Sequence, residues 1–185
     1  GKLSGRAAFA SRLEELGITF DSKDDFNQAF TRFKELADKK REIFDEDLQA
    51  LVSDVQIGAE DDAITVNDLE VLSKTGQLPT AKISIRYKDK DHQSEARGDG
   101  AVDAIFNAIE KLINSETKLQ LYSVNAVTEG TDSQGEVTVR LEKDGRIING
   151  QGADTDILLA SAKAYVNALT LMRNPGRLHP QLGGV

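Results

Sequence analysis

Residues 1–57 follow a helical pattern, in which apolar side chains recur three or four positions apart in three segments. Gly17 is a stop signal for the first segment, and Asp45 starts the third. Ser22 and Asp25 form a variant of the capping box before the second. The apolar positions of the three predicted helices are Phe9, Leu13 and Leu16; Phe26, Ala29, Phe30, Phe33, Leu36 and Ala37; and Leu48, Leu51, Val52 and Val55.

After an acidic stretch from Gly58 to Asp62, the apolar period changes to two, which is typical of strands. Turn signals separate the strands at Gly76–Pro79, Asp132–Gly135 and Asp144-Gly145. The predicted strand positions are Leu69 and Val71; Ile83, Ile85 and Tyr87; Gln93–Arg97; Leu119, Leu121 and Ser123; Val137, Val139 and Leu141; and Ile147 and Ile148. The predicted helices are Ala101–Ile113 and Asp154–Arg173, the second with a stripe of Ile157, Ala160, Ala164, Ala168 and Leu171.

The order of elements is three strands and a helix, repeated once. Two such βββα units predict antiparallel sheets with helices on one face, an α+β fold. We therefore divide the chain into a helical region (1–57), a βββα-βββα domain (58–174) and a disordered tail (175–185). Five of the seven phenylalanines lie at or before Phe33, so the helical region needs another surface to cover it.

Composition narrows the class of protein. The net charge of −8 disfavours a surface for nucleic acid or an anionic membrane. The chain has no cysteine, no apolar run that could span a bilayer and no signal peptide, so we expect a cytoplasmic protein. Because it begins at Gly1 and its only methionine is Met172, we expect it to be part of a longer protein.

Candidate catalytic groups are sparse. His92 and His179 lack a nucleophile or metal-ligand partner at useful spacing, and we interpret both as surface residues. The acidic runs Asp45–Asp47 and Glu60–Asp62 do not match calcium-loop spacing. We therefore expect no catalytic residue, no metal site and no cofactor in this chain.

A glycine pattern occurs twice, at Gly98-Asp99-Gly100 and at Gly150-Gln151-Gly152. Each copy is predicted to lie between a strand and a helix, where free backbone N–H groups can bind an anion. A dinucleotide fingerprint would need a third glycine where Asp103 and Thr155 stand, so the pattern disfavours nucleotide binding. Two small-residue half-sites favour a sensor of a small molecule with a short aliphatic side chain. The small side chains near the turns are Ala101, Val102, Ala126 and Ala153.

Four motifs in order resemble the C-terminal part of bacterial 2-isopropylmalate synthases. They are Gly1–Phe9, Phe33–Leu48, Gly98–Ala104 and Gly152–Ala162. This family condenses acetyl-CoA with 2-oxoisovalerate in leucine biosynthesis. The resemblance implies that its catalytic barrel and divalent metal precede this chain, which alone would be inactive.

The resemblance also implies that residues 1–57 are a helical connecting region and residues 58–174 a regulatory domain that binds amino acids and dimerises. Leucine would bind at the dimer interface of this regulatory domain as a feedback inhibitor. The leucine-binding residues carried over are Gly98, Gly100, Val102, Asp103, Leu119, Tyr122, Ala126, Ala153, Thr155 and Ile157. Asp154 stands where the family often has serine, and it adds a negative charge beside one half-site. The implied partners are leucine, a second copy of the chain and the barrel of the parent chain.

Two other interpretations stay open. Citramalate synthases share this architecture and are usually inhibited by isoleucine, and the two ligands differ by one methyl position, worth about 1–3 kcal/mol. The other alternative is a stand-alone amino-acid-sensing dimer module. The phenylalanine-rich helical connecting region weighs against it.

Overall fold

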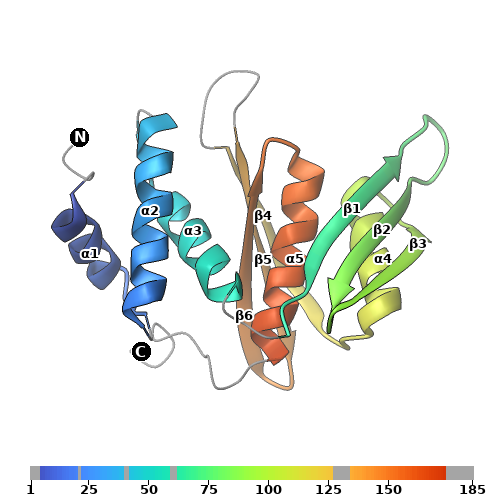
Figure 1. The fold of residues 1–185 in the computed structure, drawn as a ribbon. Helices are drawn as coiled ribbons and strands as arrows, with labels where there is room; N and C mark the ends of the chain where they lie inside the picture. The colour runs from blue at the N-terminus through green and yellow to red at the C-terminus, as the bar shows by residue number, and fades with distance from the viewer. Residues whose placement is uncertain (1–4, 21, 40–41, 59–61, 127–133, 174–185) are drawn as a thin grey trace.

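The computed structural model describes residues 5–20, 22–39, 42–58, 62–126 and 134–173 (Figure 1). The predicted tail, most of the acidic stretch before the first strand and His179 lie outside the described residues. The elements are α1 (Arg6–Glu15), α2 (Lys23–Lys39), α3 (Asp45–Gly58), β1 (Thr65–Leu72), β2 (Thr80–Tyr87), β3 (Lys90–Arg97), α4 (Ala101–Ile113), β4 (Lys118–Ala126), β5 (Gly135–Lys143), β6 (Arg146–Asp154) and α5 (Ile157–Arg173).

Local signals define the ends of the first three helices, and all three predicted helices are confirmed. Gly17 follows α1 with a φ of 73°, the left-handed conformation that glycine adopts readily. The Ser22 hydroxyl accepts the N–H of Asp25 at 3.1 Å before α2. At the start of α3, the Asp47 carboxylate accepts the N–H of Phe44 at 2.8 Å.

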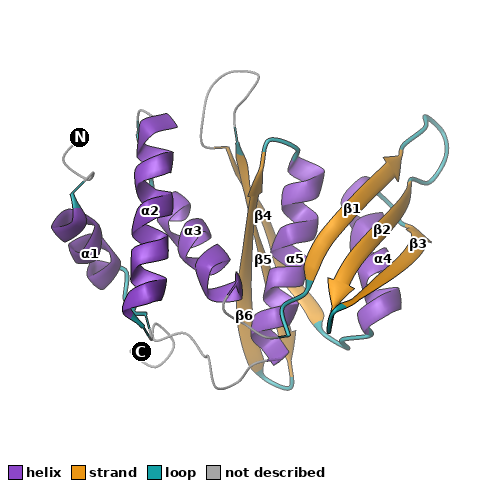
Figure 2. Ribbon diagram, in the orientation of Figure 1, coloured by secondary structure: helices purple, strands orange, loops and turns teal. Residues whose placement is uncertain are grey.

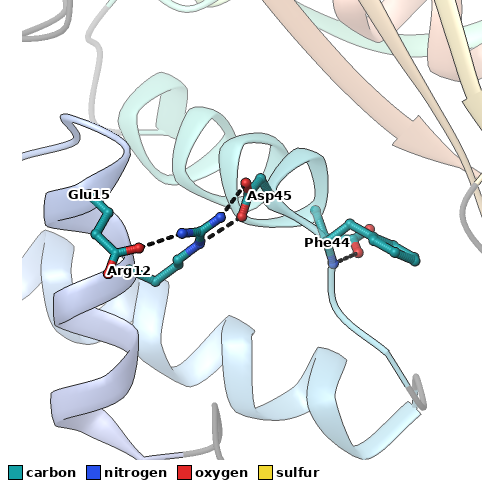
Figure 3. Close-up of polar contacts among 5 residues, drawn as sticks. Arg12, Glu15, Phe44 and Asp45 are labelled. Atoms are coloured by element: carbon teal, nitrogen blue, oxygen red, sulfur yellow. Dashed lines mark hydrogen bonds and ion pairs between the residues drawn. The ribbon is translucent and has the colours of Figure 1, made fainter.

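The three N-terminal helices share a small hydrophobic cluster built around Phe9. The Phe9 ring lies 4.7 Å from that of Phe33, 5.6 Å from that of Phe26 and 5.7 Å from that of Phe30. Leu48 and Val52 contribute from α3. A polar junction lies beside the cluster, where Arg12 of α1 binds Glu15 and both carboxylate oxygens of Asp45, the first residue of α3 (Figure 3).

The remaining elements form two three-stranded antiparallel sheets, β1-β2-β3 and β4-β5-β6, each followed by a helix (Figure 2). This confirms the α+β class and the repeated βββα order. Each first strand carries a bulge at an edge of its sheet, between Val66 and Asp68 in β1 and between Leu119 and Leu121 in β4. Bulges at edge strands discourage further pairing of the backbone.

Both units share one core. The buried side chains of both sheets and of α4 and α5 form a single cluster. The rings of Phe106 in α4 and Tyr165 in α5 stack at 4.3 Å, and the Tyr165 hydroxyl donates to Glu110 at 2.6 Å. Burial, and then this bond to a carboxylate, raise the pKa of Tyr165 above its ordinary value, so it is a neutral donor. Helix α5 lies between the two sheets and contacts β1 as well as its own strands (Figure 1).

Helix α3 joins the N-terminal helices to the second sheet. In β6, Gly150 and Gly152 face α5, so the intervening Gln151 points to the opposite face of the sheet. There its amide donates to the side chain of Gln49 in α3 at 3.1 Å. Helix α3 therefore lies on the outer face of β5 and β6, with α5 on the inner face (Figure 2).

Candidate functional site

The ten residues predicted to bind leucine fall on three parts of the fold. Gly98, Gly100, Val102 and Asp103 lie at the β3–α4 junction; Leu119, Tyr122 and Ala126 lie on β4; and Ala153, Thr155 and Ile157 lie at the β6–α5 junction. Ala126 pairs with Gly135, and Gly135 pairs with Asp154, so the end of β4 lies at the β6–α5 junction. Leu119 lies near the other end of β4, and Tyr122 between them contacts Phe106 of α4.

The β3–α4 junction leaves the start of α4 open. Gly98 is required by close approach, because a Cβ there would lie 2.6 Å from the backbone carbon of Asp103. Gly100 is the N-cap, with an ordinary extended backbone (φ −145°, ψ 176°), no side-chain cap and open space around it. The first intrahelical bond runs from Ala104 to the carbonyl of Gly100, so three amides before Ala104 precede it.

The second glycine pair has a different role, and its predicted position between a strand and a helix is wrong. Gly150 and Gly152 lie inside β6, and α5 begins at Ile157 instead of Asp154. A Cβ on Gly152 would lie 2.6 Å from the backbone nitrogen of Ala164. These glycines therefore let α5 pack closely on β6.

The structural repeat is longer than the spacing of the two glycine pairs. Helix α4 begins at Ala101, and α5 begins at Ile157. When the starts of the two helices are aligned, Gly98 corresponds to Asp154 and Gly100 corresponds to Asp156. Asp156 caps its own helix, since its carboxylate accepts the N–H of Leu158 at 2.9 Å. The start of α5 is therefore occupied by a side chain, whereas the start of α4 is not.

The extra negative charge of Asp154 is balanced locally. Its carboxylate contacts the ammonium of Lys163 at 2.9 Å and accepts the N–H of Asp156 at 2.9 Å. Burial alone would raise the pKa of Asp154, but the bond from Asp156 and the Lys163 ammonium together lower it below its ordinary value. Asp154 is therefore a structural carboxylate.

Strand β4 carries a strip of apolar side chains on the inner face of its sheet. Leu119, Tyr122 and Val124 pair with the inward-facing Leu141, Val139 and Val137. Helix α5 covers β6 and β5, so Leu119 and Val124 at the uncovered edge remain 49% and 48% exposed. We call Leu119, Tyr122 and Val124 the β4 strip.

The β4 strip contacts α4 through an aromatic pair. Tyr122 lies edge-on to Phe106, with ring centroids 6.0 Å apart. One helical turn before Phe106 is Val102, and two strand residues beyond Tyr122 is Val124. Val102 and Tyr122 both pack against the large core, whereas Val124 is 48% exposed.

Three surface cavities formed by described residues lie elsewhere. One of 720 Å³ lies between α1 and α2, one of 660 Å³ lies at the polar junction of Arg12 and Asp45, and one of 490 Å³ lies at the C-terminal ends of α4 and α5. The last contains Arg146, whose guanidinium donates to the carbonyls of Leu171 and Met172 and so caps α5.

Among the described residues, no three histidine, cysteine or acidic side chains are grouped to hold a metal ion. His92 is exposed on β3. Within the same part of the chain, no helix combines the length and hydropathy needed to cross a bilayer.

Comparison with known protein families shows to which family the chain belongs. The model of the LeuA allosteric (dimerisation) domain matches residues 42–172. The chain belongs to the LeuA allosteric (dimerisation) domain family. The match begins before α3, so α1 and α2 precede the LeuA domain and α3 is part of it.

Curated relatives that match this chain are named 2-isopropylmalate synthase. The protein from Methylococcus capsulatus is 56% identical over 186 residues, covering 100% of this chain and 36% of the relative. The protein from Chromobacterium violaceum is 56% identical over 181 residues, covering 98% and 35%. That from Nitrosospira multiformis is 57% identical over 183 residues, covering 98% and 36%. The chain spans a little over a third of the length of these relatives.

Sequence reasoning did not identify several residues that organise this part of the LeuA domain. Phe106 supports Tyr122, and Ser161 of α5 bonds to the Tyr122 hydroxyl at 2.7 Å. These residues belong to different elements and carry no shared local motif. The role of the ten predicted residues in leucine binding stays a prediction.

Proposed function

We propose that this chain is the leucine-responsive regulatory part of a 2-isopropylmalate synthase. Leucine would bind it and inhibit the condensation of acetyl-CoA with 2-oxoisovalerate in the catalytic barrel of the parent chain. The observation that supports the proposal best is the open start of α4, on a helix whose Phe106 contacts Tyr122 of the half-exposed β4 strip. The names of the relatives favour the same parent enzyme.

The chemistry of a free amino acid fits these two features. Its carboxylate would accept hydrogen bonds from the backbone N–H groups in the first turn of α4, which Gly100 leaves uncovered. Its aliphatic side chain would contact Val102 and the β4 strip. Its ammonium would bind Asp103, which is exposed and already accepts the N–H of Asp99 at 2.8 Å.

Only one of the two βββα units offers this combination. Asp156 occupies the start of α5, so the second unit lacks the open amides of the first. We therefore propose one leucine site per chain, built from the β3–α4 junction and β4. Ala153, Thr155 and Ile157 would flank it without contributing a second equivalent site.

A second copy of the chain would complete the site. Leu119 and Val124 are half-exposed on a face that is otherwise buried, and a twofold interface would place each strip against the same region of its partner. Dimer formation and leucine binding would then share the same residues. The description of the family as a dimerisation domain supports this arrangement.

The test uses two aliphatic residues of nearly equal exposure on opposite faces of one sheet. Val124→Asp places a charge in the β4 strip, and Ile147→Asp places it on the outer face of β6, where the parent residue is 49% exposed. Sedimentation equilibrium measures the dimer, and calorimetry measures leucine binding. We expect Val124→Asp to weaken both and Ile147→Asp to leave both unchanged. Equal behaviour of the two variants would contradict the proposed interface.

The same calorimetry compares leucine with isoleucine. Tighter binding of isoleucine would favour the citramalate synthase alternative, and binding of neither would favour a dimer module without this effector. We also propose that the chain alone lacks condensation activity. Release of coenzyme A from acetyl-CoA by the purified chain with 2-oxoisovalerate would overturn that part.

A further inference from the structure

Tyr122 is the central residue of the β4 strip, and its ring is held at two places. Leu119 and Val124 flank it and are half-exposed, whereas Tyr122 is partly buried. The ring lies edge-on to Phe106, with an interplanar angle of 70°. Its hydroxyl lies 2.7 Å from the hydroxyl of Ser161.

The direction of that hydrogen bond follows from the second bond of Ser161. The Ser161 hydroxyl has one proton, which it donates to the carbonyl of Ile157 at 2.8 Å. It therefore accepts from Tyr122, and the phenol proton points to α5. The chain of bonds runs from Tyr122 through Ser161 to the first residue of α5.

We propose that Ser161 is a positioning residue that sets the effector specificity of the leucine site. By holding the Tyr122 hydroxyl, it fixes the orientation of the ring that would form the apolar wall. A wall that cannot rotate distinguishes a side chain branched at Cγ from one branched at Cβ, because the two place one methyl group differently. This inference rests on the proposed function.

The experiment measures the ratio of the isoleucine and leucine dissociation constants by calorimetry on the full-length parent protein. Ser161→Ala removes the acceptor, and Tyr122→Phe removes the donor while leaving the Ser161–Ile157 bond in place. We expect each variant to lower the ratio about two- to tenfold, the factor that corresponds to one hydrogen bond. The double variant should show the same ratio as either single variant, because both remove one interaction.

Thr170→Val is the matched control. Thr170 is also fully buried on α5, donates to the carbonyl four residues earlier (Val166, 2.9 Å) and accepts a bond from the N–H of Ile64 at 3.0 Å. Its partner lies just before β1, away from the β4 strip. This variant should be destabilised with an unchanged ratio, which separates positioning from a general effect on stability.

An unchanged ratio in Tyr122→Phe, with wild-type leucine affinity, would overturn the inference even where Ser161→Ala folds poorly. A ratio that falls equally in Thr170→Val would overturn it too, because the effect would then follow stability alone. Failure of the wild-type protein to bind leucine would instead refute the proposed function, and the inference with it.

Discussion

Replacing Gly152 by alanine tests whether the second glycine pair serves packing. The new Cβ would lie 2.6 Å from the nitrogen of Ala164 and closer still to the carbonyl oxygen of Ala160. Ordinary contact begins at 3.4 Å, so α5 and β6 would have to separate by about 1 Å. Both opposing atoms belong to the helix backbone and cannot rotate away.

We expect Gly152→Ala to lower the free energy of unfolding by about 1–3 kcal/mol, the usual cost of overpacking. With an m value of about 2 kcal/mol/M, a loss of about 2 kcal/mol moves the urea midpoint by about 1 M. Tyrosine fluorescence is a suitable probe. The chain has no tryptophan, and its three tyrosines report on the large core, because Tyr165 is buried in it and Tyr87 and Tyr122 pack against it.

Gly100→Ala is the control, because nothing lies within 4 Å of its Cβ and its backbone is in an extended conformation. Alanine restricts the unfolded chain, which stabilises the variant by about 0.4–1 kcal/mol. This gain offsets the loss of about 1 kcal/mol that comes from alanine being a poorer N-cap than glycine. We expect an unchanged midpoint for this variant. Equal midpoints for the two alanine variants would refute the packing role of Gly152.

The other predictions concern the N-terminal helices and the β6–α5 junction. Phe33→Ala removes a side chain that is 1% exposed and should lower the free energy of unfolding by about 3–5 kcal/mol. Phe44→Ala, at a residue that is 41% exposed, should lower it by under about 1 kcal/mol. Loss of the helical circular-dichroism signal in urea measures both variants. In the full-length parent, Phe30→Ala with Phe33→Ala should weaken leucine inhibition while leucine still binds, measured on a sample whose circular dichroism shows that the helices stay folded. Full inhibition with normal binding would show that the signal does not travel through α2. Asp154→Asn should be less stable than wild type at pH 7. Because the pKa of Asp154 is lowered in the folded state, its contribution is present above about pH 4 and disappears as the pH falls through the folded pKa. The urea midpoints of wild type and Asp154→Asn should therefore differ by the same amount at pH 7 and pH 5 and approach each other at pH 3. A gap that stays constant down to pH 3 would contradict the ion-pair explanation.

Much of the secondary structure follows from local sequence. The Ser22 cap, the left-handed Gly17 and the start of α3 at Asp45 each depend on atoms only a few residues apart. The strands can be predicted equally well, because apolar and polar side chains alternate along them and place Ile83 and Ile85 on one buried face. Such signals act over a single turn or a single strand, so they need no knowledge of the tertiary fold.

The failures arise where the same local pattern serves two tertiary roles. A glycine pair before a helix permits either a tight turn or the close approach of a helix to a strand, and both occur in this chain. Gly98 and Gly100 lie at a turn, whereas Gly150 and Gly152 lie under α5. Only the position of α5 against β6 distinguishes the two cases.

The candidate site depends still more on tertiary structure. The sequence alone predicted two equivalent half-sites, but the capping of α5 by Asp156 leaves only α4 open. Ser161 lies 39 residues from Tyr122 and meets it because α5 packs against the inner face of the second sheet. Helix and strand periodicity arise from neighbouring residues, whereas such a contact arises from the packing of whole elements, which no local pattern encodes.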